Sequence, residues 1–271
     1  MSTSRPQDSP LRTAIELAGA AGDLLYSYYG SLRRGDAERK GGQRRDLVTR
    51  ADREAERLVY EGIPAADDVL AEEGSARHSG ARRRWIVDPL DGTVNYLHGI
   101  PFWAVSIAIV EDDRLAAAVV HAPALRQTFT AEAGRGCRLD DAEVRVSSTA
   151  EIGEALLATG FAYNRDAVDD TNLGNFAVLA MAAAGVRRLG AASLDLAYTA
   201  CGRLDGFWEL HLQPWDVAAG TLLVREAGGT VTDFRGNEGV EPVLFAGNIV
   251  ATNGHLHEAL RGRLGRLEGT P

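Results

Sequence analysis

The sequence contains few cysteines and no long hydrophobic run. Its 271 residues include two cysteines, Cys137 and Cys201, which are too few for a disulfide framework and lack the histidine cluster of a zinc site. No apolar stretch approaches the roughly 18 residues of a membrane span. The opening MSTSRPQDSP also has no apolar centre of the kind that a signal peptide needs. We therefore expect a cytoplasmic protein with reduced thiols and no membrane partner.

Positive charge is also scarce. The chain has 29 Lys and Arg residues against 38 Asp and Glu residues, which gives a formal net charge of −9. A nucleic-acid-binding surface normally shows a basic stripe, so nucleic acid is not an expected partner. The hydrophobic fraction of 45% and the charged fraction of 25% are typical of a globular protein with a sizeable core. Because an acidic protein repels small anions, an anionic substrate would need a local reversal of the field.

Signals for nucleotide hydrolysis and for a protein nucleophile are missing. The Walker pattern GxxxxGK[ST] does not occur, and Gly134-Arg135-Gly136 is a lone GxG in an expected hairpin turn. No Ser or Cys lies in a convincing nucleophile motif. The six histidines form no organised set, and His98 is interpreted as structural. The remaining candidates for chemistry are carboxylates.

Hydrophobic periodicity predicts an α/β protein whose character changes near its middle. A helix is expected over residues 11–28, and Thr49 has the features of the N-cap of a second helix. Strands are predicted at 85–87, 102–110, 115–120 and 128–131, with a hairpin turn at 111–114. The second part alternates strands at 156–161, 204–209, 230–233 and 249–252 with helices at 172–184, 193–200, 215–227 and 257–267. We expect an N-terminal half of residues 1–148 and a C-terminal half of residues 149–271.

The most informative segment is WIVDPLDGTVNYLHGIP, which starts at position 85. An apolar strand runs into Asp88, and Pro89 lacks a backbone donor, so we expect the strand ladder to stop there. Asp88 and Asp91 can then converge on one point, while Gly92 lets the backbone approach a ligand closely. If a helix follows, the amides of Gly92 and Thr93 favour an anion. The alternative is that both aspartates only cap a turn.

Other acidic residues lie where a structural explanation is available. Glu72 and Glu73 form a pair in a polar stretch, and most such pairs are solvated. Asp216 begins an apolar helix, which is a position that acidic residues favour as caps. Asp52 follows Thr49 in a first turn, where it supports a capping arrangement. Taken singly, none of these carboxylates indicates a site.

Taken together, these segments resemble the inositol monophosphatase family. The strings DLVTRAD (46–52), AEEGS (71–75), DPLDGTVNYLHGIP (88–101) and PWDVAAG (214–220) occur in the order found in that family. Further matches are RRLGAASLDLAYTACGRLDGFWE (187–209) and REAGGTVTD (225–233), so the resemblance covers nearly the whole chain. It implies an α/β fold, a layered α/β/α/β/α sandwich of the inositol monophosphatase and fructose-1,6-bisphosphatase type.

The resemblance also implies a metal site and a set of substrate contacts. Two or three Mg²⁺ ions, for which Mn²⁺ could substitute, would be held by Glu72, Asp88, the carbonyl of Leu90, Asp91 and Asp216. Asp52 and Thr93 would orient the attacking water. The substrate would be contacted by Gly92, Thr93, Arg187 and Glu209. The ligand chemistry agrees independently, because carboxylates without His or Cys suit Mg²⁺ or Mn²⁺.

Two positions depart from the family's pattern. Ala71 stands before the Glu pair, where relatives usually carry Gly. Lys40 precedes Asp46 by more residues than the usual Lys does, with Arg44 and Arg45 between them. We therefore expect this loop to be placed differently from the loop of relatives.

The implied activity is Mg²⁺-dependent hydrolysis of a phosphomonoester by a metal-activated water. Inositol 1-phosphate is the leading substrate, with myo-inositol and phosphate as products. The alternatives with the same chemistry are histidinol phosphate, fructose 1,6-bisphosphate and a 3′-phosphoadenosine nucleotide. A regulatory or binding protein without turnover on the same fold is an alternative of another class. Relatives are commonly dimers, so a homodimer is expected.

Overall fold

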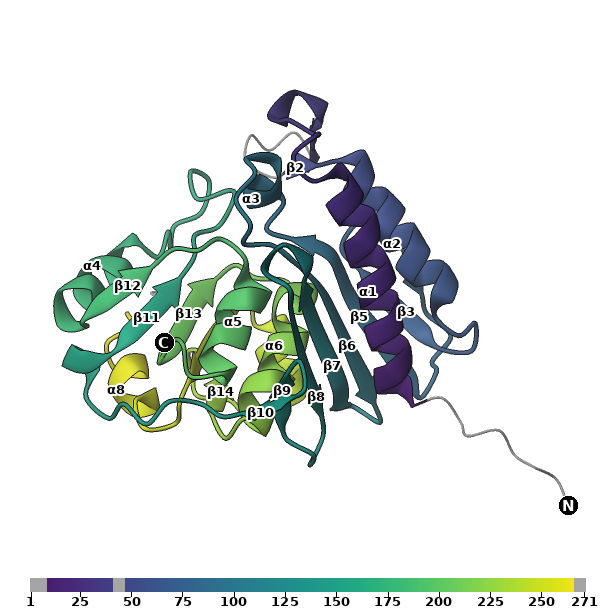
Figure 1. The fold of residues 1–271 in the computed structure, drawn as a ribbon. Coiled ribbons are helices and arrows are strands. Elements are labelled where there is room, and N and C mark those ends of the chain that lie inside the picture. Colours follow the sequence, from purple (N-terminus) through teal and green to yellow (C-terminus); the bar gives the residue numbers. More distant parts are fainter. Residues whose placement is uncertain (1–8, 41–46, 266–271) are drawn as a thin grey trace, which may run out of the picture.

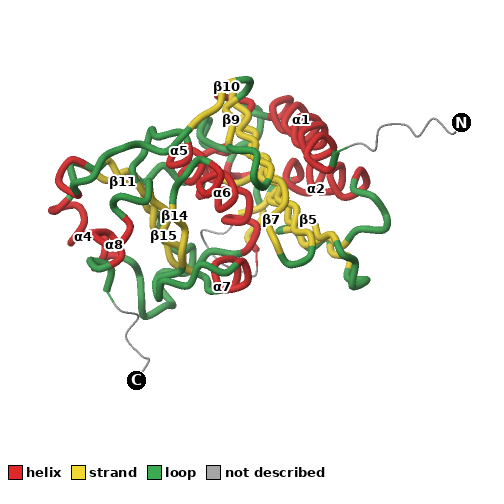
Figure 2. Tube along the Cα trace, turned by 90° about the horizontal axis from the view of Figure 1, so that it is seen from below, coloured by secondary structure: helices red, strands yellow, loops and turns green. Residues whose placement is uncertain are grey.

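Layers of helix and sheet alternate through the molecule in the order α/β/α/β/α (Figure 1). The computed structural model describes residues 9–40 and 47–265. Figure 2 shows α1 (Pro10–Tyr28) and α2 (Arg50–Gly62) on one outer side, and α4 (Leu173–Ala182) and α8 (His257–Arg261) on the other. Helices α5 (Ala192–Ala200) and α6 (Pro214–Glu226) lie between the two main sheets. The layered fold predicted from the sequence is confirmed.

The first main sheet has eight strands and contains the segment around Asp88. In spatial order the strands are β10 (Ala142–Val144), β9 (Cys137–Leu139), β8 (Gln127–Glu132), β7 (Arg114–Ala122), β6 (Ala104–Glu111), β5 (Arg83–Asp91), β3 (Asp68–Ala71) and β4 (Ala76–Arg77). Neighbours pair antiparallel except β3 and β5, which run parallel. The predicted turn between β6 and β7 is confirmed: Asp112 and Asp113 have φ values of 47° and 58°, as a two-residue hairpin turn requires.

Helices α1 and α2 cover one face of this sheet (Figure 1). The fully buried positions of α1 recur at helical spacing, as one apolar stripe requires; they include Ala14, Ala18, Ala21 and Leu25. Thr49 is the N-cap of α2, as predicted: its hydroxyl accepts from the amides of Ala51 and Asp52, and the Asp52 carboxylate accepts from the Thr49 amide. This capping box fixes the side chain of Asp52 at the start of the helix.

The second main sheet has five strands and is covered by α4 and α8 on its outer side. Its strands, in spatial order, are β12 (Gly185–Arg187), β11 (Leu156–Thr159), β13 (Gly206–Leu210), β15 (Asn248–Thr252) and β14 (Thr230–Thr232). Helix α7 (Val240–Phe245) connects β14 to β15. Side chains from both sheets, α5 and α6 form one apolar core, so the two parts share an interior. The division at residue 148 falls between β10 and β11 and stays a prediction.

Two segments differ from the expected local structure. The stretch from Arg33, expected as a loop, contains a short 3-10 helix, η1 (Arg34–Asp36), and β1 (Glu38–Arg39), which pairs with β2 (Leu47–Val48); positions 41–46 of that stretch lie outside the described residues. The C-terminal helix was expected to reach residue 267, but α8 ends at Arg261, and residues 266–271 are not described. Within the described ranges, no helix is both long and apolar enough to cross a membrane.

Candidate active site

Asp88 and Asp91 lie at the end of β5, on either side of an irregularity in the strand. The predicted end of the strand at Pro89 is wrong, because β5 continues to Asp91. Its register with β6 shifts between Asp88 and Asp91, so the pairing passes over the proline that cannot donate. Both aspartates are buried. The amide of Leu90 donates to Asp88 Oδ1 at 3.0 Å, so the irregular segment holds one of its own carboxylates.

Gly92 turns the chain from β5 into α3 (Thr93–Leu97). Its φ of 91° lies in the left-handed region, which glycine adopts at little steric cost. A Cβ at this position would lie 3.0 Å from the carbonyl oxygen of Phe102, so the turn leaves no room for a side chain. The structure thus explains why glycine stands between Asp91 and Thr93.

Thr93 and Asp52 come from different helices and meet at the end of β5. Thr93 Oγ1 lies 3.1 Å from Asp52 Oδ1 and 3.1 Å from the carbonyl oxygen of Leu90. The other Asp52 oxygen accepts from the amide and the hydroxyl of Thr49. Burial raises the pKa of Asp52 to about 6, although the hydrogen bonds from Thr49 lower it. A proton can therefore pass between Thr93 Oγ1 and a carboxylate that titrates near neutral pH.

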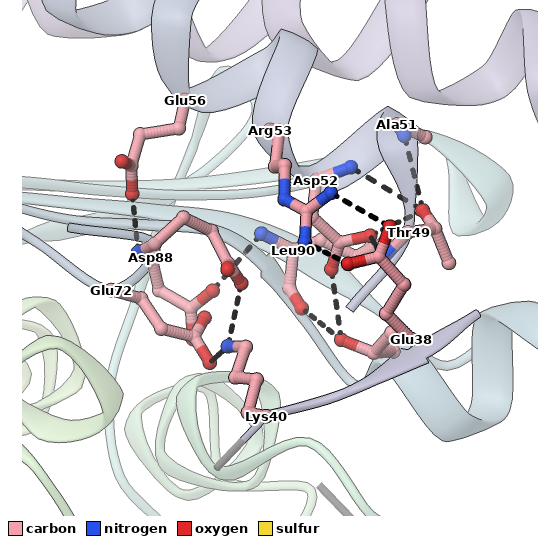
Figure 3. Close-up of polar contacts among 12 residues, drawn as sticks. Glu38, Lys40, Thr49, Ala51, Asp52, Arg53, Glu56, Glu72, Asp88 and Leu90 are labelled. Atoms are coloured by element: carbon pink, nitrogen blue, oxygen red, sulfur yellow. Dashed lines mark hydrogen bonds and ion pairs between the residues drawn. The ribbon is translucent and has the colours of Figure 1, made fainter. Parts of the chain in front are cut away.

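Glu72 and Glu73 directly follow β3, and the side chain of Glu72 lies beside Asp88 of β5 (Figure 3). The Glu56 carboxylate of α2 holds their loop by accepting from the amides of Glu73 at 2.6 Å and Ser75 at 2.9 Å. Lys40 Nζ lies 2.7 Å from Glu72 Oε1 and 2.6 Å from Glu73 Oε1. Burial alone would lower the pKa of Lys40, but the charges and hydrogen bonds of the two glutamates outweigh it and raise the pKa. Lys40 thus belongs to this site despite its unusual spacing in the sequence.

Asp216 reaches the site from the central helix layer, in the first turn of α6 (Figure 2). The N-cap of α6 is Gln213 rather than Asp216, but the Asp216 carboxylate accepts from the amide of Gln213 at 2.6 Å in a capping box, so Asp216 also stabilises the start of the helix. Asp91 is fixed from the same side: the amide of Ser193 donates to Asp91 Oδ2 at 2.8 Å, and the Ser193 hydroxyl donates to the same oxygen. The two helices of the central layer therefore close one side of the site.

These carboxylates carry more negative charge than the described residues around them balance. Burial raises the pKa of Asp88 well above its usual range, and the charges of Glu72, Asp91 and Asp216 add to the rise. Burial and the charge of Glu72 raise the pKa of Asp216 in the same way. Burial also raises the pKa of Asp91 to about 6, although Ser193 lowers it by hydrogen bonding. Asp88 and Asp91 are buried, Glu72 and Asp216 are partly buried, and four acids that repel one another in such a setting favour a bound cation.

The donor set fits a hard divalent metal. All the side-chain donors are carboxylate oxygens, which Mg²⁺ and Mn²⁺ accept and which zinc or copper sites rarely use alone. In the part of the chain that the structure describes, no three acidic, His or Cys side chains are already disposed to hold one ion. Lys40, Leu90, Ser193 and Gln213 instead occupy carboxylate oxygens with hydrogen bonds. Metal binding would therefore replace the Lys40 contact and draw the carboxylates together.

A cavity of about 560 Å³ opens beside these carboxylates. Glu72, Asp91 and Asp216 line it, whereas Asp52, Asp88, Leu90, Gly92 and Thr93 lie outside its lining. Glu209 of β13 lines the cavity as well. Burial raises the pKa of Glu209 to about 8, although the charge of Arg188 lowers it. The cavity thus joins residues of both sheets, as ligand sites between layers commonly do.

Arg187, predicted as a substrate contact, lies outside the cavity lining, whereas its neighbour Arg188 lines the cavity. Arg187 is exposed in β12, where its guanidinium lies 3.4 Å from the carbonyl oxygen of Val186. Successive side chains of an extended segment point to opposite sides, so only one of two neighbouring arginines can point toward the cavity.

Several residues of the site carry no signal that identified them in the sequence. Arg188, Asp195 and Gly160 line the cavity, and Ser193 and Glu56 position Asp91 and the Glu72 loop. Glu56 could have been found, because it lies four residues after Asp52 and on the same face of α2. The others depend on pairings between segments distant in the sequence.

Replacing Glu209 by Gln is expected to stabilise the metal-free protein at alkaline pH much more than at acidic pH. With a folded-state pKa of about 8, Glu209 keeps a proton that the unfolded chain releases near pH ~4.3. The wild type therefore loses stability as the pH rises from there toward 8, and the Gln variant avoids this loss. Urea unfolding in EDTA measures the free energy of unfolding of each protein. The difference between the two free energies should be larger at pH 8 than at pH 5 by at least ~1 kcal/mol. An equal difference at both pH values would contradict the expected titration.

Comparison with known proteins agrees with this geometry. The chain matches the Inositol monophosphatase family over residues 7–267. It is 42% identical over 258 residues to the Nus factor SuhB of Pseudomonas aeruginosa, which covers 92% of this chain and 93% of the relative. It is also 42% identical over 259 residues to the inositol-1-monophosphatase of Rhizobium meliloti, with 93% and 94% covered. The solved structure of extragenic suppressor protein suhB from Bartonella henselae has a TM-score of 0.84 at 38% identity and covers 94% of this chain and 98% of that one.

The match extends over almost the whole chain, and it includes both sheets and every carboxylate of the site. The family name supports a phosphatase activity, whereas the SuhB names leave the specific role of the activity open. On this evidence the chain belongs to the inositol monophosphatase family.

Proposed function

We propose that this protein is a Mg²⁺-dependent phosphomonoesterase that hydrolyses inositol 1-phosphate to myo-inositol and phosphate. The observation that carries the proposal is a cluster of four buried or partly buried carboxylates beside a cavity; they belong to Glu72, Asp88, Asp91 and Asp216. Divalent ions would neutralise these charges and reverse the local field. The site could then accept a phosphate dianion that the acidic protein alone would repel. The name of the R. meliloti relative supports the same activity.

Each part of the site has a role in this proposal. Two or three Mg²⁺ ions, with Mn²⁺ as the expected substitute, would be held by Glu72, Asp88, the Leu90 carbonyl, Asp91 and Asp216. When bound, the metal stabilises negative charge on oxygen and lowers the pKa of bound water. Thr93 Oγ1 accepts the proton of the attacking water and passes its own proton to Asp52 Oδ1, 3.1 Å away. The buried position of this pair keeps bulk water from competing for the proton.

The substrate's two ends meet different residues. The amides of Gly92 and Thr93 would contact the phosphate, and Glu209 with Arg188 would contact the leaving group in the cavity. Histidinol phosphate, fructose 1,6-bisphosphate and a 3′-phosphoadenosine nucleotide are the alternative substrates for the same chemistry. A cytoplasmic homodimer without a nucleic-acid partner stays our expectation.

The test is phosphate release from a panel of these esters, with Mg²⁺ and with EDTA. We expect turnover only with metal and the highest kcat/KM for inositol 1-phosphate. A higher kcat/KM for another ester would replace the substrate and keep the chemistry. Turnover that is unchanged in EDTA would overturn the metal-dependent mechanism, and absence of turnover on every ester would overturn the enzyme assignment.

A second candidate role is that of a Nus factor, because the P. aeruginosa relative of that name is as similar as the R. meliloti enzyme. The test is to replace the P. aeruginosa protein by this chain and, in parallel, by its Asp91→Asn variant. Replacement by both would support a Nus-factor role independent of catalysis. Failure of both would remove this candidate and leave the phosphatase proposal intact.

A further inference from the structure

Asp195 is a buried carboxylate in the cavity wall that the proposed chemistry leaves unused. It lies in the first turn of α5 and is 1% exposed, and it lines the cavity. Across residues 9–40 and 47–265, no group forms a hydrogen bond with its Oδ1. A buried polar atom without a partner is costly. This oxygen therefore lacks a donor that a ligand in the cavity can supply.

Helix α5 does not need the Asp195 side chain. The N-cap is Ala191, and it makes no side-chain capping bond. The Asp195 amide donates to the Ala191 carbonyl at 3.0 Å, and the Asp195 carbonyl accepts from Thr199 Oγ1 at 2.9 Å. The backbone is thus satisfied without the carboxylate. The helix dipole favours an acid in this turn, but it gives Oδ1 no hydrogen-bond donor.

The neighbours of Asp195 define the chemistry of this end of the cavity. Glu209 lines the same end of the cavity. Its carboxylate has room there because residue 160 is glycine, since a Cβ at that position would overlap the Glu209 carboxylate oxygens. Burial raises the pKa of Asp195, the charges of Glu209 and Asp91 add to the rise, and Arg188 opposes it. The positive charge of Arg188 therefore lowers the pKa of both acids.

We infer that Asp195 is a specificity-determining residue that accepts, at Oδ1, a hydrogen bond from a hydroxyl of the leaving group. The inference rests on the proposed phosphomonoesterase function. A hydroxyl supplies the missing donor without bringing charge. Glu209, in the same wall, can accept from a second hydroxyl. The phosphate of such a substrate would lie toward Asp91 and Asp216, which line the same cavity.

This arrangement selects a neutral polyol as the leaving group. A second phosphate placed at this end would lose its hydration against a buried wall that contains Asp195 and Glu209, and burying a dianion is costly unless cations pair with it. The Lys and Arg side chains that line the cavity are Lys40 and Arg188, and Lys40 is already paired with Glu72 and Glu73, so Arg188 alone is left for such a dianion. An alcohol with several hydroxyls therefore fits this end of the cavity better than the second phosphate of fructose 1,6-bisphosphate.

The experiment compares two esters that differ in leaving-group hydroxyls, inositol 1-phosphate and phenyl phosphate, in the Mg²⁺-loaded full-length protein. In Asp195→Ala we expect kcat/KM for inositol 1-phosphate to fall by about 10- to 100-fold, the range for a buried partner left unpaired. For phenyl phosphate, which has no hydroxyl to lose a partner, we expect less than about a threefold change. Asp195→Asn keeps an acceptor oxygen and should recover most of the loss.

Thr199→Ala is the matched control, because it alters the next turn of α5 and lies outside the cavity lining; it should leave the ratio of the two kcat/KM values unchanged. Equal losses on both esters in Asp195→Ala, or no loss, would overturn the inference. If the wild type releases phosphate from neither ester, the proposed function fails, and calorimetric binding of the same esters decides the inference. Weaker binding of inositol 1-phosphate alone in Asp195→Ala would then support it, and equal or absent binding would overturn it.

Discussion

Asp91→Asn is expected to lower the rate of phosphate release from inositol 1-phosphate by about a thousandfold at saturating Mg²⁺. Metal coordination contributes several kcal/mol of transition-state stabilisation, and each ~1.4 kcal/mol is a factor of ten in rate. Asparagine is nearly the same size as aspartate and can still accept from the amide and hydroxyl of Ser193, which hold Asp91 in place. The variant should therefore fold normally and lose the charge alone. The measurement is kcat from phosphate release over a range of Mg²⁺ concentrations.

The same variant should become more stable when metal is absent. Burial raises the pKa of Asp91 to about 6. At pH 8 Asp91 is ionised in both states, but its charge is buried in the folded wild type and hydrated in the unfolded chain, so ionisation destabilises the fold. We expect a higher Tm in EDTA for Asp91→Asn and a smaller rise in Tm on adding Mg²⁺, because weaker binding gives less stabilisation. Asp23→Asn, an exposed change on α1, is the control and should alter neither quantity. A kcat within a few fold of the wild type would exclude Asp91 as a metal ligand.

The sequence was most informative where one short segment contains both the local structure and the chemistry. Thr49 and Asp52 predicted a helix cap, and the cap is what aims Asp52 at Thr93. The string DPLDGT placed two carboxylates and a glycine at one strand end, where the structure also has them. Local geometry is set within a few residues there, so periodicity and turn chemistry are sufficient to predict it.

The parts that the sequence did not show depend on segments that meet only after folding. Ser193 binds Asp91 across 102 positions, and no local pattern encodes that contact. Pro89 predicted a strand end, but pairing with β6 on the far side of the irregularity outweighs the missing donor. Arg188 rather than Arg187 lines the cavity because of the register in which the short edge strand β12 pairs with β11. A one-residue shift in such a strand changes the side on which each side chain lies.

Thr93→Val is expected to lower kcat by about 10²- to 10³-fold while leaving the Mg²⁺ dependence and KM nearly unchanged. General acid–base groups contribute in this range, and the substitution removes the hydroxyl that lies 3.1 Å from Asp52 Oδ1. Valine has nearly the volume of threonine and keeps its branched shape. The metal ligands stay in place, so a loss confined to kcat would assign Thr93 to proton transfer rather than to metal binding. Steady-state kinetics at several Mg²⁺ concentrations measure the separation.

A double-mutant cycle with Asp52→Asn decides whether the two residues act as one unit. If Thr93 passes its proton to Asp52, each single change breaks the same path, so the double variant should be no slower than the slower single variant. Multiplied losses would mean that the residues act independently. Thr221→Val is the matched control: its hydroxyl is buried in α6 and has no hydrogen-bond partner among the described residues. Thr221→Val should keep full activity, because the Thr221 hydroxyl takes part in no proton transfer. If this control loses as much activity as Thr93→Val, both losses result from altered packing.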